Sequence, residues 1–205
     1  MKNHIAYLKY VLKHKWHVLA ACPETKTSLW RGLFHDWTKF LPSEWKDYVY
    51  TFYAEDGSKR YKENRGFYYA WNSHQKRNKH HWQYWLLKMD NGTLFPLEMP
   101  VKYVNEMLAD WIGAGLAITG KRETKQWYER NKNKMILHER TRKYVERFLN
   151  VEARKESLII GKDFPNAHRF DLPEHERKIS RKSLEHLREA CTLCKTGKYK
   201  KGEVK

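Results

Sequence analysis

The segment Phe34–Phe40 constrains the fold more than any other stretch of the chain. At about 100° per residue in an α-helix, His35, Asp36 and Lys39 fall within one arc, and apolar residues occupy the other positions. We therefore predict a short helix that buries a polar arc among apolar neighbours. Buried polar groups need partners, either hydrogen-bonding neighbours or a metal ion. Because a single His-Asp pair is common by chance, other segments must supply those partners.

The spacing of apolar residues predicts helices along most of the chain and no strand alternation. A helix over residues 3–21 is expected to end near Pro23, and a cap at Thr25, Thr27 or Ser28 begins a second helix that runs through His35 and Asp36. Further helices are predicted over residues 43–53, 67–85 with a bend allowed near Asn78, 101–119, 121–149 with a bend allowed at 135–137, and 182–194.

These elements predict an all-α protein, with a helical bundle over residues 1–150 and a basic C-terminal helical extension of unknown role over residues 151–205, flexible at its end. Asp90-Asn91-Gly92 is a turn signal between two of the helices. The run Gly113-Ala114-Gly115 lies inside the helix over residues 101–119 and would let another helix approach closely.

Composition bounds the location and the partners. The 205 residues contain 40% hydrophobic residues, enough for a folded core, and carry a net charge of +17. This charge favours anionic partners such as nucleotides, nucleic acid, or acidic lipid and protein surfaces. The sequence contains no membrane span or signal peptide, and its three cysteines are too few for a disulfide framework, so we expect a cytoplasmic protein that does not enter a membrane. A zinc site formed by Cys22, His186, Cys191 and Cys194 is a weaker alternative.

Several helices carry residues that could bind a metal ion, and their joint occurrence is more informative than any one of them. A lone histidine near tryptophans is usually a hydrogen-bonded structural group. A mid-helix aspartate such as Asp110 is harder to dismiss, since burial without a partner is costly, and Glu106 lies one turn before it. The candidates are His14 or His17, His35, Asp36, His74, His80, His81 and Asp110.

This order of one His, then His-Asp, then further His, then Asp on successive helices resembles the HD-domain superfamily of metal-dependent phosphohydrolases. Lys39 in His35-Asp36-Trp37-Thr38-Lys39 matches the His-Asp-x-x-Lys form that many members carry. The chain looks closest to a compact, uncharacterised group of HD-like proteins of phages and bacteria, which would place it in the host cytoplasm if it is encoded by a phage. The resemblance covers residues 1–150.

The resemblance implies a first metal ion held by His14, His35, Asp36 and Asp110. It implies a second ion bridged by Asp36 and bound by His74 and by His80 or His81. His14 is preferred because the resemblance runs through His14-Lys15-Trp16, although His17 shares its helix face. On an unbroken helix His81 lies over His74 and is the first choice, whereas a bend near Asn78 leaves His80 open.

Mixed imidazole and carboxylate ligands suit one or two divalent transition-metal ions, namely Mn, Fe, Co, Ni or Zn. We expect a phosphohydrolase that acts on a nucleotide or other phosphorylated small molecule, with Asp36 and Lys39 as catalytic residues. Lys39, Lys121 and Arg122 are expected to bind the anionic substrate. Two alternatives remain: an HD-type di-iron oxygenase, and a basic non-enzymatic protein that keeps a structural metal and binds nucleic acid or an acidic host protein.

Overall fold

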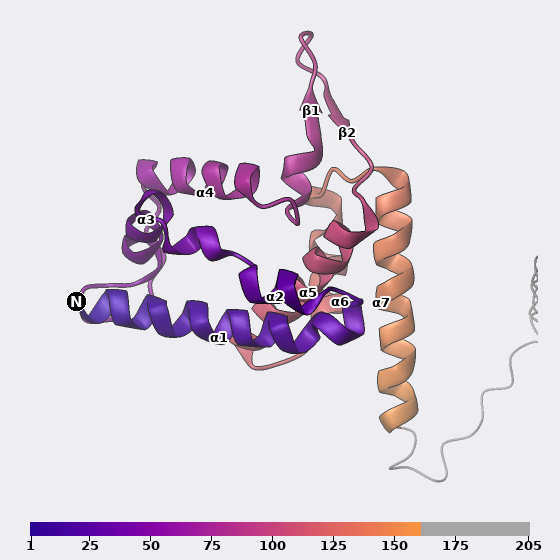
Figure 1. Ribbon diagram of the computed structural model, residues 1–205, viewed down its shortest axis with the longest axis horizontal. Helices are drawn as coiled ribbons and strands as arrows, with labels where there is room; N and C mark the ends of the chain where they lie inside the picture. Colours follow the sequence, from indigo (N-terminus) through magenta and orange to yellow (C-terminus); the bar gives the residue numbers. More distant parts are fainter. Residues whose placement is uncertain (161–205) are drawn as a thin grey trace, which may run out of the picture. The chain divides into compact units, whose positions relative to one another are not determined.

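The structure is a computed structural model that describes the backbone of residues 1–160 and the side chains of residues 1–150. In these residues α-helices dominate and one short two-stranded sheet accompanies them, so the all-α prediction is confirmed (Figure 1). The predicted helix over residues 182–194 and the alternative zinc ligands His186, Cys191 and Cys194 lie outside the described residues, as does most of the predicted extension.

Helix α1 (Lys2–Thr25) packs along helix α5 (Val101–Thr119), and this pair forms the base of the candidate site. Helix α1 continues past Pro23 and ends where Lys26 adopts the left-handed conformation, with φ at 58°. As predicted, a glycine permits the close approach: a Cβ atom on Gly113 would lie 2.5 Å from Val18 Cγ2. The bounds of α5 agree with the helix predicted over residues 101–119.

The predicted helix through His35 and Asp36 is wrong. Helix α2 spans only Leu29–Phe34, and a short 3₁₀ helix, η1, spans Trp37–Phe40. Between them Asp36 takes a left-handed conformation, with φ at 54°. The break turns His35 and Asp36 into the interior, where each is 1% exposed. A continuous helix would instead have rotated them apart by about 100°.

The apolar residues around the His-Asp pair also differ from the prediction. Phe34 and Trp37 are 60% and 54% exposed, and Leu33 and Phe40 are exposed as well. They flank the buried polar groups in sequence without covering them. The pair is covered by other elements.

Helix α3 (Pro42–Phe52) is close to its predicted range, and helix α4 (Arg65–Arg77) begins after Asn64, whose Oδ1 accepts a hydrogen bond from Phe67 N at 3.0 Å. Helix α4 ends before Asn78, so the predicted continuation to residue 85 is wrong. A 3₁₀ helix, η2 (Trp82–Trp85), follows it.

A β-hairpin follows η2, although no strand was predicted. Strand β1 (Leu86–Lys88) pairs antiparallel with β2 (Leu94–Pro96), and the Asp90-Asn91-Gly92 turn lies between them, with Gly92 at φ 84°. Three-residue strands are too short to show a period-two pattern, which is why sequence periodicity missed them.

The predicted helical stretch over residues 121–149 is divided. Helix α6 (Thr124–Asn131), a 3₁₀ turn, η3 (Lys132–Lys134), and helix α7 (Glu139–Ile160) take its place, with the break close to the predicted bend. The largest core cluster joins α5, α6 and α7 through residues such as Met107, Leu108, Tyr128 and Val145. Among the described residues, no helix combines the length and the apolar character needed to cross a bilayer.

Candidate metal centre

Residues from five parts of the chain converge at one buried position. Helix α1 contributes His14, and the break between α2 and η1 contributes His35 and Asp36. Helix α4 and the residues after it contribute three histidines, and α5 contributes two carboxylates. The full set is His14, His35, Asp36, His74, His80, His81, Glu106 and Asp110.

The first group of ligands contains two histidines and two aspartates. His14 Nε2 lies 3.2 Å from Asp110 Oδ1 and 3.6 Å from Asp36 Oδ2. His35 Nε2 lies 3.4 Å from each of the same two oxygens. All four ligand atoms lie within 4.8 Å of one another, so they can surround one ion. His17 is only partly buried and belongs to none of the groups.

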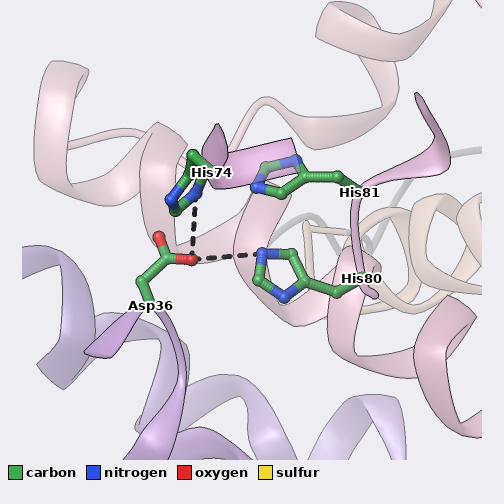
Figure 2. A group of neighbouring side chains, drawn as sticks. All are labelled: Asp36, His74, His80 and His81. Atoms are coloured by element: carbon green, nitrogen blue, oxygen red, sulfur yellow. Dashed lines mark ion pairs between the residues drawn. The ribbon is translucent and has the colours of Figure 1, made fainter. Parts of the chain in front are cut away.

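The second group contains three histidines and the other oxygen of Asp36. His74 Nε2 and His80 Nε2 lie 3.3 and 3.2 Å from Asp36 Oδ1, as the dashed lines in Figure 2 mark. His81 completes the group and presents its ring beside those of His74 and His80 (Figure 2). The break after α4 brings both His80 and His81 to the centre, so the choice between them disappears. Asp36 is the residue common to both groups.

Most ligand atoms of this centre lack hydrogen bonds. Asp36 Oδ2 is paired with Lys39, whereas Asp36 Oδ1 and five imidazole nitrogens are buried without a hydrogen-bond partner among the described residues: His14 Nε2, His35 Nε2, His74 Nε2, His80 Nε2 and His81 Nε2. Leaving so many buried polar atoms unpaired costs about 1–3 kcal/mol each. A cation at their centre removes this cost, so the residues present fit a metal site.

Two buried glutamates hold the outer nitrogens of three of the histidines. Glu106 Oε1 lies 3.4 Å from His35 Nδ1 and 3.3 Å from His80 Nδ1. Glu44 Oε2 lies 2.8 Å from His74 Nδ1. A carboxylate that accepts the proton of one ring nitrogen directs the other nitrogen to a metal and raises its basicity. Glu106 therefore acts on one histidine of each group, while Glu44 acts on the second group alone.

The charge of the cluster suits a cation. Burial opposes ionisation, but His35 and Lys39 keep the pKa of Asp36 well below its usual range, and His14 and His35 do the same for Asp110. The pKa of Glu106 falls to about 2, because hydrogen bonds to His35 and His80 outweigh its burial. Burial, with His80 and His74 nearby, lowers the pKa of His81, which keeps its ring neutral and able to bind a metal.

Lys39 also lies at the candidate metal centre, beside Asp36. Its ammonium nitrogen is 2.5 Å from Asp36 Oδ2, and its side chain is 16% exposed. Although burial disfavours its charged form, the carboxylate of Asp36 raises its pKa, so Lys39 is a permanent cation beside the shared ligand.

Two of the predicted substrate-binding residues lie elsewhere. A pocket of about 330 Å³ adjoins the centre, and neither Lys121 nor Arg122 lines it. Arg122 Nη2 instead lies 2.5 Å from Glu24 Oε1. The basic residue at the pocket is Lys134, from η3. Lys134 lies in the same basic stretch of sequence as Lys121 and Arg122, but spacing alone could not show that it lines the pocket.

Comparison with known protein families gives a match over most of the chain. Residues 3–151 match the model of a family described as "Family of unknown function (DUF5662)". The chain belongs to this family. The DUF5662 match spans both ligand groups, from His14 to Asp110. No curated protein and no solved structure matches the chain significantly.

Sequence reasoning missed one part of the centre in this DUF5662 protein. Glu44 is fully buried, contacts His74, and also accepts hydrogen bonds from Thr38 Oγ1 at 3.1 Å and Arg77 Nη1 at 3.1 Å. In the sequence it is an acidic residue in the first turn of a helix, where glutamates are common because they complement the helix dipole. No local signal distinguishes it from such a surface residue.

Proposed function

We propose that the protein is a metal-dependent phosphohydrolase of the HD type, acting on a nucleotide or another small phosphate ester. The observation that carries the proposal is the position of Asp36. Its Oδ2 faces His14 and His35, and its Oδ1 faces His74 and His80. A carboxylate with one oxygen directed to each of two ligand groups suits a residue that bridges two ions.

The donor set supports transition metals over Mg or Ca. Five imidazoles and two aspartates form a mixed nitrogen and oxygen shell, which suits Mn, Fe, Co, Ni or Zn, whereas hard ions prefer oxygen ligands throughout. When bound, such ions supply an activated water and polarise a phosphoryl oxygen.

The protein's own residues would bind and orient the substrate. Lys39 is charged, close to Asp36 and partly accessible, so its ammonium group can neutralise charge that develops on a phosphate or leaving oxygen. Glu44 and Glu106 hold three imidazole rings in place through their outer nitrogens. Ligand order along the chain, from His14 through His35-Asp36 to Asp110, supports membership in the HD superfamily.

Elemental analysis and a hydrolysis screen test the proposal together. We expect the purified protein to contain one or two equivalents of a transition metal and to release phosphate from at least one nucleotide or sugar phosphate when Mn is added. His14→Ala should lose metal and activity. The matched control is His17→Ala on the same helix, which should keep both, because His17 lies outside the ligand groups.

Three results would overturn the proposal. A folded wild-type protein that takes up no metal would make the histidines purely structural. Iron together with oxygen consumption, and no phosphate release, would favour a di-iron oxygenase. Salt-dependent binding to nucleic acid that persists in a folded Asp36→Asn variant, again with no hydrolysis, would favour a basic binding protein.

A further inference from the structure

A pocket lined by tryptophans lies against the candidate metal centre. Its lining includes His80, His81 and Asp110, so a ligand in the pocket would touch residues of both ligand groups. Four tryptophans from four different elements form much of the remaining wall: Trp71 from α4, Trp82 from η2, Trp111 from α5 and Trp127 from α6.

These indole rings are arranged around the space and are not all part of the core. The ring centroids of Trp111 and Trp127 are 5.1 Å apart at an interplanar angle of 57°, and Trp71 meets His81 edge-on at 5.2 Å. Trp127 remains 38% exposed. Four indole rings beside a charged centre, with Trp127 exposed, form a site for a ligand that has a flat apolar part and an anionic part.

We propose that this pocket holds the base of a mononucleotide while its phosphate lies at the metal centre. The inference rests on the proposed function and narrows its substrate from small phosphate esters in general to nucleotides. Flat bases stack on aromatic side chains, and each such contact changes affinity by roughly 5- to 150-fold. A sugar phosphate has no flat aromatic ring that could stack on these tryptophans.

The size and the polar residues of the pocket agree with this assignment. At about 330 Å³ it is at the small end of the ~300–1,000 Å³ range of ligand pockets, which suits a single nucleotide better than a strand. Gln83 lines it, and the Oε1 atom of this residue is buried without a hydrogen-bond partner among the described residues. An amide there matches the donors on the edge of a base. Lys134, which is exposed, adds positive charge.

Nucleosides test the pocket separately from hydrolysis, because they carry the base and have no phosphate to release. Adenosine, guanosine, cytidine and uridine would be titrated against the full-length protein while its tryptophan fluorescence is followed, with ribose as the control lacking a base. We expect at least one nucleoside to quench the fluorescence saturably and ribose to have no effect. Trp127→Ala should lower the affinity of the protein for that nucleoside by at least about fivefold.

Two further variants keep the result interpretable. Trp127→Phe retains an aromatic face and should recover part of the affinity. Trp30→Ala removes a tryptophan that is 72% exposed on α2 and lies outside the pocket, so it should bind the nucleoside as the wild type does. The proposal is overturned if no nucleoside binds, or if Trp127→Ala and Trp30→Ala have the same effect.

Phosphate release distinguishes this inference from the proposed function. Hydrolysis of ribose 5-phosphate as efficient as that of every nucleoside monophosphate would support a phosphohydrolase and overturn the base pocket. Nucleoside binding that depends on Trp127, together with no phosphate release from any nucleotide or sugar phosphate in the presence of any added metal, would support the pocket and overturn the hydrolase.

Discussion

The two ligand groups share Asp36 but differ in their other members. The first group adds one aspartate and two histidines, whereas the second adds three histidines and no further carboxylate. The first position is therefore the more negative and the more oxygen-rich, and the second is dominated by neutral nitrogen donors. Because harder ions prefer oxygen and borderline ions accept imidazole, we expect Mn or Fe to favour the first position and Zn, Co or Ni the second.

The two groups also differ in how the chain supports them. His14 and Asp110 stand on two long helices that pack closely at Val18 and Gly113. His80 and His81 lie in the irregular residues between α4 and η2. The side chains of the second group therefore rely more on hydrogen bonds to hold them in position. The comparison indicates that the second group depends more on its outer residues than the first.

Asp36→Asn should have the largest effect on metal binding. Among the residues that the structure describes, only Asp36 belongs to both ligand groups. We expect the purified variant to lose metal from both positions, and the proposed phosphohydrolase activity to fall by more than the ~10–100-fold that outer-residue changes cost. Circular dichroism would establish that the variant folds, since its Lys39 loses a charged partner. Retention of one full equivalent of metal would contradict the role of Asp36 as a shared ligand.

A smaller and selective effect is expected from changing one group at a time. Asp110→Asn should empty the first position and leave the second, and His74→Ala should do the reverse. Native mass spectrometry of each variant, titrated with Mn and then with Zn, measures the two occupancies. Loss of all metal from both variants would mean that the two groups form a single cooperative site, and the proposed difference in metal preference would fail.

The sequence predicted the residues of this comparison better than the backbone that positions them. Apolar spacing predicted the helices that carry His14 and Asp110, whereas the choice of His14 over His17 came from the family resemblance, because both histidines share one helix face. The left-handed conformation of Asp36 could not be predicted, because helical spacing within the segment gives no sign of it. The same limit hid the positions of His80 and His81, which depend on where α4 ends.

The outer glutamates give the next smaller effect and test whether support differs between the groups. Glu44→Gln should weaken the second position alone by about 10–100-fold, because Glu44 contacts only His74 among the ligands. Glu106→Gln should weaken both positions, because Glu106 contacts His35 and His80. Dissociation constants from competition with a metal indicator measure this. If Glu44→Gln lowered the metal affinity of both positions equally, the two groups would not differ in their dependence on the outer glutamates.

Thr38→Val should have the smallest effect on metal affinity. It tests further whether outer residues support the second group more than the first. Thr38 Oγ1 lies 3.1 Å from Glu44 Oε2 and accepts a hydrogen bond from Asn78 Nδ2 at 2.8 Å, so it links the break at Asp36 to the end of α4. Its loss leaves buried groups unpaired and should destabilise the fold by about 1–3 kcal/mol in urea unfolding. We expect the affinity of the second position to fall by less than tenfold and that of the first to be unchanged.

Thr141→Val is the matched control for this last variant. Thr141 is also buried, and its hydroxyl accepts a hydrogen bond from Met99 N at 3.0 Å, away from the ligand groups. It should cost similar stability and leave both metal affinities unchanged. If Thr141→Val weakens the second position as much as Thr38→Val does, general destabilisation explains the loss. If only Thr38→Val weakens it, the hydrogen bonds between η1, α3 and α4 hold the second group in place.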